Sequence, residues 1–81
     1  MKLLIISPET RQEHDVAWVE INTKAGNFII LAEHAPMVAT LTENQDVTFC
    51  FEDGKQETIN PTGGTAEVTR SAVKLLLNSA P

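Results

Sequence analysis

The amino-acid sequence predicts an all-β protein, a two-layer antiparallel β-sandwich of about eight to ten short strands in one domain over residues 1–81. Short runs of apolar and β-branched residues alternate with turn residues along the whole chain. No stretch shows the sustained apolar stripe of an amphipathic helix. A chain of 81 residues is also too short to be divided into two parts that each have a core. These observations favour one sandwich that uses most of the apolar residues.

Four extended segments are expected in the first half of the chain, each ended by a turn residue or a proline. They are Lys2–Ile6, Asp15–Ile21, Phe28–Leu31 and Met37–Leu41. A hairpin turn at Lys24–Asn27 joins the second segment to the third. The stretch Gly26–Ala32 carries no charge. We therefore expect it to lie in the core, with its strand buried on both sides.

Side-chain alternation divides the apolar residues of the second segment between two faces. Ala17, Val19 and Ile21 are expected on one face. Val16 and Trp18 are expected on the other. Because the chain has only four aromatic residues, one Trp and three Phe, Trp18 is better interpreted as a core or interface anchor than as a ligand-stacking ring.

The second half of the chain contains four further expected strands. They are Val47–Phe51, Lys55–Ile59, Thr65–Thr69 and Ala72–Leu77. A turn at Asp53 and Gly54 makes the second of these antiparallel to the first. In the first, Cys50 is expected to face away from the phenylalanine side. The expected core of the sandwich consists of Ile5, Val19, Ile21, Phe28, Ile30, Leu41, Val68, Val73 and Leu75.

The charge balance excludes several classes of partner. Six basic and eleven acidic residues give a net charge of −5, and the basic residues are scattered singly. Nucleic acids and anionic lipids require clustered positive charge, so neither is an expected partner. The single cysteine, Cys50, cannot form an internal disulfide, which indicates a reducing, intracellular compartment. The apolar run Leu3–Ile6 is too short for a membrane span, so any membrane association is expected to be peripheral.

The sequence predicts no catalytic, cofactor-binding or metal-binding residue. The segment Asn60–Thr65 contains two glycines but lacks the lysine and the following helix of a phosphate-binding loop, so a turn is the better interpretation. Four residues could contribute to a metal site but have no ligand spacing: His14, Asp15, His34 and Cys50. For His34 two interpretations remain open, a hydrogen bond to the local backbone and a contact with a partner.

Two segments resemble signatures of the epsilon subunit of F-type ATP synthases, which is called delta in mitochondria. In Gly26–Leu41, a glycine precedes an apolar strand, His34-Ala35-Pro36 and a second apolar strand. In Thr62–Val68, a small residue and two glycines precede Glu-Val. The similarity spans nearly the whole chain. The sequence departs from the family pattern at Glu33, and it lacks an expected apolar residue in the stretch Arg11–His14.

The resemblance implies a non-catalytic rotor subunit of the central stalk of a proton-translocating ATP synthase. Such a subunit docks on the gamma subunit and on the c-ring, so that rotation of the ring reaches catalytic sites on other chains. The resemblance implies no cofactor and gives no strong reason to expect a homo-oligomer. It also implies a peripheral position on the cytoplasmic face of the bacterial inner membrane, as part of the ATP synthase complex. The docking residues implied are Asn27, Glu33, His34, Ala35, Pro36 and Met37, with the turn Thr62, Gly63 and Gly64 beside them.

Longer family members continue into a two-helix hairpin that can block rotation. Because the sequence stops at Pro81, we expect a short form that couples rotation without this regulation and without binding ATP. The main alternative is a free-standing β-sandwich module that binds a small ligand or a protein. A small enzyme is a weaker third hypothesis. Clustered aromatic or polar groups on one open face would favour the binding module.

Overall fold

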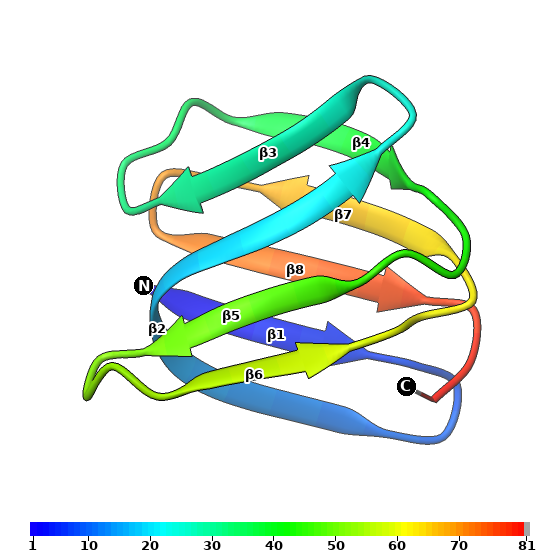
Figure 1. Cartoon of the computed structure of the whole chain (residues 1–81), viewed down its shortest axis with the longest axis horizontal. Helices are drawn as coiled ribbons and strands as arrows, with labels where there is room; N and C mark the ends of the chain where they lie inside the picture. Colours follow the sequence, from blue (N-terminus) through cyan, green and yellow to red (C-terminus); the bar gives the residue numbers. More distant parts are fainter. Residues whose placement is uncertain (81) are drawn as a thin grey trace.

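The computed structural model describes residues 1–80, which form eight β-strands and no helix (Figure 1). In chain order the strands are β1 (Lys2–Ile6), β2 (Arg11–Thr23), β3 (Gly26–Leu31), β4 (Met37–Leu41), β5 (Val47–Phe51), β6 (Gln56–Ile59), β7 (Gly64–Val68) and β8 (Ala72–Leu77). The predicted all-β class and the predicted segments are confirmed, with boundaries that differ by a few residues. None of residues 1–80 belongs to a helix capable of crossing a membrane.

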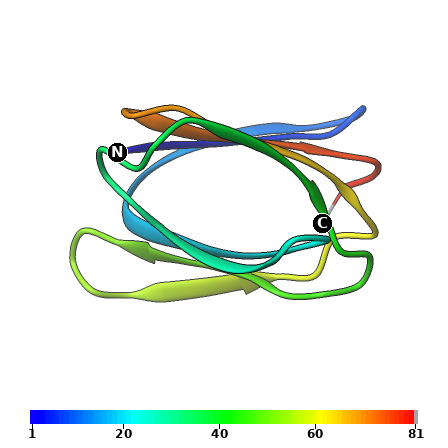
Figure 2. The same ribbon diagram turned by 90° about the horizontal axis from the view of Figure 1, so that it is seen from above.

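The strands form two layers that are joined through β2 (Figure 2). The first layer contains the beginning of β2, followed by β1, β8, β7 and β4. The second layer contains β3, the end of β2, β5 and β6. All strand pairs are antiparallel except β1 and β8, which run in parallel. The two-layer sandwich is therefore as predicted, with one parallel pair that the local sequence pattern does not specify.

A β-bulge lets β2 pass from one layer to the other. The register of β2 against β5 shifts between Val16 and Trp18. Val16 and Val19 are both fully buried, whereas Ala17 is exposed. The prediction that Ala17 shares a face with Val19 and that Val16 lies opposite is thus wrong. One inserted residue reverses the alternation, because strand side chains repeat with a period of two.

The core lies between the layers and consists of alternate residues from nearly every strand. Its buried members are Leu3, Ile5, Val16, Val19, Ile21, Ile30, Leu41, Val47, Phe49, Ala66, Val68, Val73, Leu75 and Leu77. Each large side chain buried in this way contributes roughly 1.5–3 kcal/mol. All predicted core residues are present except Phe28, which is half-buried and packs against the edge of the core.

His14 occupies an inward position for which the sequence offered no apolar residue. It pairs with the buried Leu3, and its ring stacks on Phe49 with the centroids 5.4 Å apart. Its ring also meets the ring of Phe51 edge-on at 5.5 Å. The imidazole therefore fills a gap between the two layers. This explains how the stretch Arg11–His14 lacks an aliphatic residue and still packs against the core.

Strand β3 is buried on only one side. Ile30 is fully buried, but Ile29 and Leu31 are 57% and 56% exposed. The expectation that Gly26–Ala32 lies in the core is therefore wrong. The reason is topological: β3 pairs only with β2, at the edge of the second layer, and no third layer covers its outer side.

Candidate docking surfaces

The loop between β3 and β4 forms one end of the molecule together with the turn between β7 and β8. The backbone N–H of Glu33 donates to the carbonyl of Arg70 at 2.8 Å, and that of His34 donates to Leu31 at 3.1 Å. Glu33 has a positive φ of 68°, which is uncommon for a residue with a side chain. The loop is thus held in a defined conformation against its neighbour.

The side chains of this loop differ in how available they are. Those of Glu33, Ala35 and Pro36 are exposed, whereas His34 and Met37 are half-buried. His34 Nδ1 hydrogen-bonds the carbonyl oxygen of Ala35 at 2.7 Å, which is the local backbone contact considered from the sequence. Met37 packs against the core. Within residues 1–80 the only ion pairs are those of Lys2 with Glu13 and Asp15, so the carboxylate of Glu33 has no cationic partner there.

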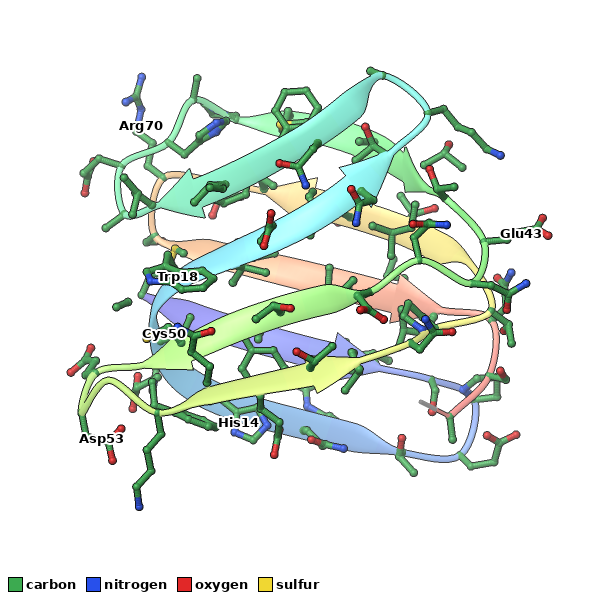
Figure 3. The ribbon with its side chains drawn as sticks, viewed as in Figure 1. His14, Trp18, Glu43, Cys50, Asp53 and Arg70 are labelled. Atoms are coloured by element: carbon green, nitrogen blue, oxygen red, sulfur yellow. The ribbon has the colours of Figure 1, made fainter. Side chains whose placement is uncertain are left out.

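The turn Thr62–Gly64 lies at the opposite end of the molecule. Strand β4 pairs with β7 such that Met37 meets Val68 and Leu41 meets Gly64. Four residues of strand, about 13 Å, therefore separate the two groups of implied docking residues. In Figure 3, Arg70 lies at the end that carries the loop, and Glu43 lies at the opposite end, near the turn. The structure does not bring the turn beside the loop.

Internal packing accounts for the two glycines of this turn. Gly64 has a φ of +152°, and a Cβ atom there would clash with the carbonyl oxygen of Leu76 on β8. Gly63 is buried beside the side chains of Asn78 and Glu43. The hydroxyl groups of Thr62 and Ser79 hydrogen-bond each other at 2.8 Å. The motif therefore allows the start of β7 to pack closely against the end of β8.

Asn27 lies on the outer face of the second layer, near the end that carries Gly64. Its Nδ2 donates to Glu20 Oε2 at 3.2 Å and to Asn22 Oδ1 at 3.0 Å. Asn22 Nδ2 in turn donates to the carbonyl of Asp46 at 3.0 Å. The hydrogen-bonded amide side chains of Asn22 and Asn27 thus fix the position of the Glu20 carboxylate.

Sequence reasoning missed the apolar group on this face. Leu31, Trp18 and Cys50 lie opposite one another on β3, β2 and β5, and Trp18 and Cys50 are side by side in Figure 3. Ile29 is in the next row, opposite Glu20. Strict alternation along β3, with Ile30 inward, could have revealed this group. We call the residues Trp18, Glu20, Asn27, Ile29 and Leu31 the β2–β3 face.

Within the described residues, no group of three or more His, Cys, Asp or Glu side chains could hold a metal ion. The same part of the chain encloses no pocket. Cys50 is 7% exposed, and its Sγ lies 3.4 Å from the carbonyl oxygen of Phe51.

The strand order, the bulge in β2 and the glycine-dependent contact between β7 and β8 define a β-sandwich domain of one particular topology. The chain belongs to the family described as ATP synthase, Delta/Epsilon chain, beta-sandwich domain, whose model matches residues 1–81. The resemblance inferred from the sequence is confirmed. A search of curated protein sequences finds no match.

Two solved structures contain chains with the same fold. One is the Euglena gracilis mitochondrial ATP synthase, described as OSCP/F1/c-ring, with a TM-score of 0.88, 24% identity and 98% of this chain covered. The other is the central stalk/c-ring of the Tetrahymena thermophila mitochondrial ATP synthase, with a TM-score of 0.80, 11% identity and 98% coverage. This chain spans 51% and 63% of the lengths of those two chains.

Proposed function

We propose that this protein is a non-catalytic subunit of the central stalk of a proton-translocating F-type ATP synthase. In this role it docks on the gamma subunit and on the c-ring, and it couples rotation to ATP synthesis. The observation that carries the proposal is the family match over residues 1–81. It is supported by the two chains of similar fold, which come from ATP synthase assemblies that include a c-ring.

The physical properties of the domain suit a mechanical role. Transmission of torque needs a stiff body with adhesive surfaces, and a closely packed β-sandwich is such a body. A chain with this role works peripherally to the membrane, as part of the complex, and we place it on the cytoplasmic face of the bacterial inner membrane. No specific observation favours the free-standing binding module over this role.

The loop Glu33–Met37 is the proposed contact with the gamma subunit and the ring. Its exposed carboxylate at Glu33 is available to a basic side chain of a partner, but an exposed ion pair contributes only about 0–1 kcal/mol. Glu33→Ala should therefore weaken assembly slightly. A bulky charge at His34 or Met37 should weaken assembly more, because it must be accommodated within the contact.

Affinity capture with the gamma subunit of the same organism tests the proposal. The wild-type chain should co-purify with gamma and, in detergent, with the c-ring. Glu33→Ala should be compared with Glu43→Ala, a matched change of an exposed carboxylate at the opposite end of the molecule. Failure of the wild-type chain to bind gamma would refute the proposed function. Unchanged binding by His34→Arg and Met37→Arg would show that the loop is not the contact.

A further inference from the structure

The β2–β3 face combines exposed apolar side chains with an aromatic anchor. Ile29 and Leu31 are each more than half exposed, and the half-buried Trp18 lies opposite Leu31. Contiguous exposed apolar groups on a small soluble domain are typical of interaction sites. Tryptophan is enriched among the residues that dominate binding energy. The face therefore has the composition of the centre of an interface.

The edge of the second layer at β3 lacks the protection that the other edge has. Strand β6, at the far edge, exposes Gln56, Glu57 and Thr58, and Lys55 precedes it. Charged residues on an edge strand oppose unwanted pairing. The stretch Gly26–Ala32 carries no charge at all. An unprotected apolar edge beside an apolar face indicates a region that is covered in the working protein.

The charges of the two layers restrict what can cover this region. The strands of the second layer contain Glu20 and Glu57 but no lysine or arginine. The strands of the first layer carry both signs: Lys2, Arg11, Glu13, Asp15, Glu67 and Lys74. A face with a carboxylate and no basic residue does not suit an anionic lipid surface. It suits a protein surface that supplies positive charge.

Glu20 is the one ionisable group within the apolar face. It is half-buried, it accepts a hydrogen bond from Asn27, and no Lys, Arg or His of residues 1–80 forms an ion pair with it. Covering this carboxylate with apolar groups alone would leave a charge without a partner, which is costly. A second copy docking through the same face about a two-fold axis would bring another Glu20 carboxylate into the interface, and the one basic residue of the hairpin, Lys24, lies in the turn beyond the end of β2. The occupant must therefore bring its own lysine or arginine.

We propose that the β2–β3 face binds the gamma subunit through an apolar patch of that subunit that contains a lysine or arginine paired with Glu20. Trp18, Ile29 and Leu31 supply the apolar contact, and Asn27 orients the carboxylate. The identity of the partner rests on the proposed function. The assignment of the face rests on the exposed side chains and charges described above. This surface lies beside the loop Glu33–Met37, because β3 leads directly into that loop.

The test uses purified wild-type chain, gamma subunit and four single variants. Ile29→Asp and Leu31→Asp should each lower the affinity for gamma by about tenfold or more, as expected when a charge enters the centre of an interface. Glu20→Gln keeps the shape and an acceptor for Asn27, and it should lower the affinity by about tenfold and flatten its salt dependence. Val38→Asp is the matched control, because Val38 is 74% exposed on the first layer. Its affinity should stay within about twofold of wild type.

Trp18 provides a direct readout, since it is the only tryptophan in the chain. Incorporation of 5-fluorotryptophan gives one ¹⁹F signal, which should shift and broaden when gamma is added. Thermal unfolding of each variant establishes that it is folded, and both Ile29 and Leu31 are exposed enough to tolerate aspartate.

The outcomes separate the two proposals. If the wild-type chain does not bind gamma, the proposed function fails. If it binds but Ile29→Asp and Leu31→Asp bind equally well, the proposed function stands and the assignment of the face is wrong. A ¹⁹F shift that depends on the concentration of this chain alone, together with a dimer in sedimentation, would assign the face to a second copy and would also overturn the inference.

Discussion

The two layers present similar inner sides and different outer sides. Both contribute alternate, fully buried aliphatic residues to one core, such as Leu75 from the first layer and Ile21 from the second. On the outside, the first layer interleaves apolar residues with charges of both signs, as where Val38 lies opposite Glu67. The second layer places Ile29 and Leu31 together with only Glu20. Inner positions are determined by packing, so the outer positions distinguish what each layer can bind.

The sharpest test of this comparison uses two neighbouring residues of β3. Ile30→Ala removes a fully buried side chain and should lower the free energy of unfolding by about 2–5 kcal/mol. Ile29→Ala changes a side chain that is 57% exposed and should lower it by at most about 0.5 kcal/mol. Urea denaturation followed by circular dichroism measures both. Equal losses would mean that the outer side of β3 is covered within the isolated chain.

A second test compares a glycine of the first layer with a glycine of the second. Gly64→Ala should lower the free energy of unfolding by about 2–4 kcal/mol, because the added Cβ must push β7 away from the Leu76 carbonyl. Gly54→Ala lies in an open turn with a φ of +94° and should cost only about 1 kcal/mol of backbone strain. Chemical denaturation of both variants measures the difference. A similar cost at both positions would show that the close approach of β7 and β8 relaxes easily.

A third test addresses the turn between β2 and β3, which sets the direction of β3. Thr23 is buried, and its Oγ1 donates to the carbonyl of Gly26 at 2.9 Å and accepts from the N–H of Ala25 at 3.1 Å. Thr23→Val keeps the shape and leaves both backbone groups without that partner. It should cost about 1–2 kcal/mol in unfolding free energy. Faster amide hydrogen exchange at Ala25 would locate the loss in this turn, and Thr40→Val, at an exposed position of β4, is the control.

Much of the fold could be predicted from the sequence, because strand periodicity and turn residues act locally. The segments at Lys2–Ile6, Met37–Leu41 and Ala72–Leu77 have the predicted boundaries. The predictions of side-chain burial were wrong where contacts between strands, and not the local sequence, determine which side chains are buried. One inserted residue at Ala17 reverses the alternation of side chains along β2. Strand β3 lies at an edge, so Ile29 and Leu31 are exposed although the uncharged apolar sequence around them is typical of a buried strand. Neither the parallel pairing of β1 with β8 nor the layer that a strand joins is encoded in its own residues.

The candidate site was harder to predict than the fold. The family signatures drew attention to Glu33–Met37 and to Thr62–Gly64, but pairing within the sheets places these segments at opposite ends. Gly64 of the second signature serves the close approach of β7 to Leu76, and Gly63 packs beside Asn78 and Glu43. The β2–β3 face emerges only when strands distant in sequence are aligned, because Trp18, Leu31 and Cys50 share no local pattern.

The smallest expected effect concerns the charged outer side of the first layer. Lys2 Nζ lies 3.0 Å from Asp15 Oδ1 and 3.6 Å from Glu13 Oε2, across the pairing of β1 with β2. The hydrogen bond to Asp15, followed by the charge of that carboxylate, raises the pKa of Lys2 above its ordinary value. Because the folded chain binds this proton more tightly than the unfolded chain, the contribution is fully present below the unfolded pKa of Lys2. It is lost as the pH rises through the higher pKa of the folded state. All three side chains are about half exposed or more, so the effect should be small and screened by salt.

Lys2→Met should therefore lower the midpoint of thermal unfolding slightly at pH 7 in low salt. The difference from wild type should disappear in 1 M NaCl and at pH values above the folded pKa. Lys55→Met, at an exposed turn position outside those ion pairs, is the control. A difference that persists under both conditions would attribute the effect to the packing of the side-chain stem instead of its charge.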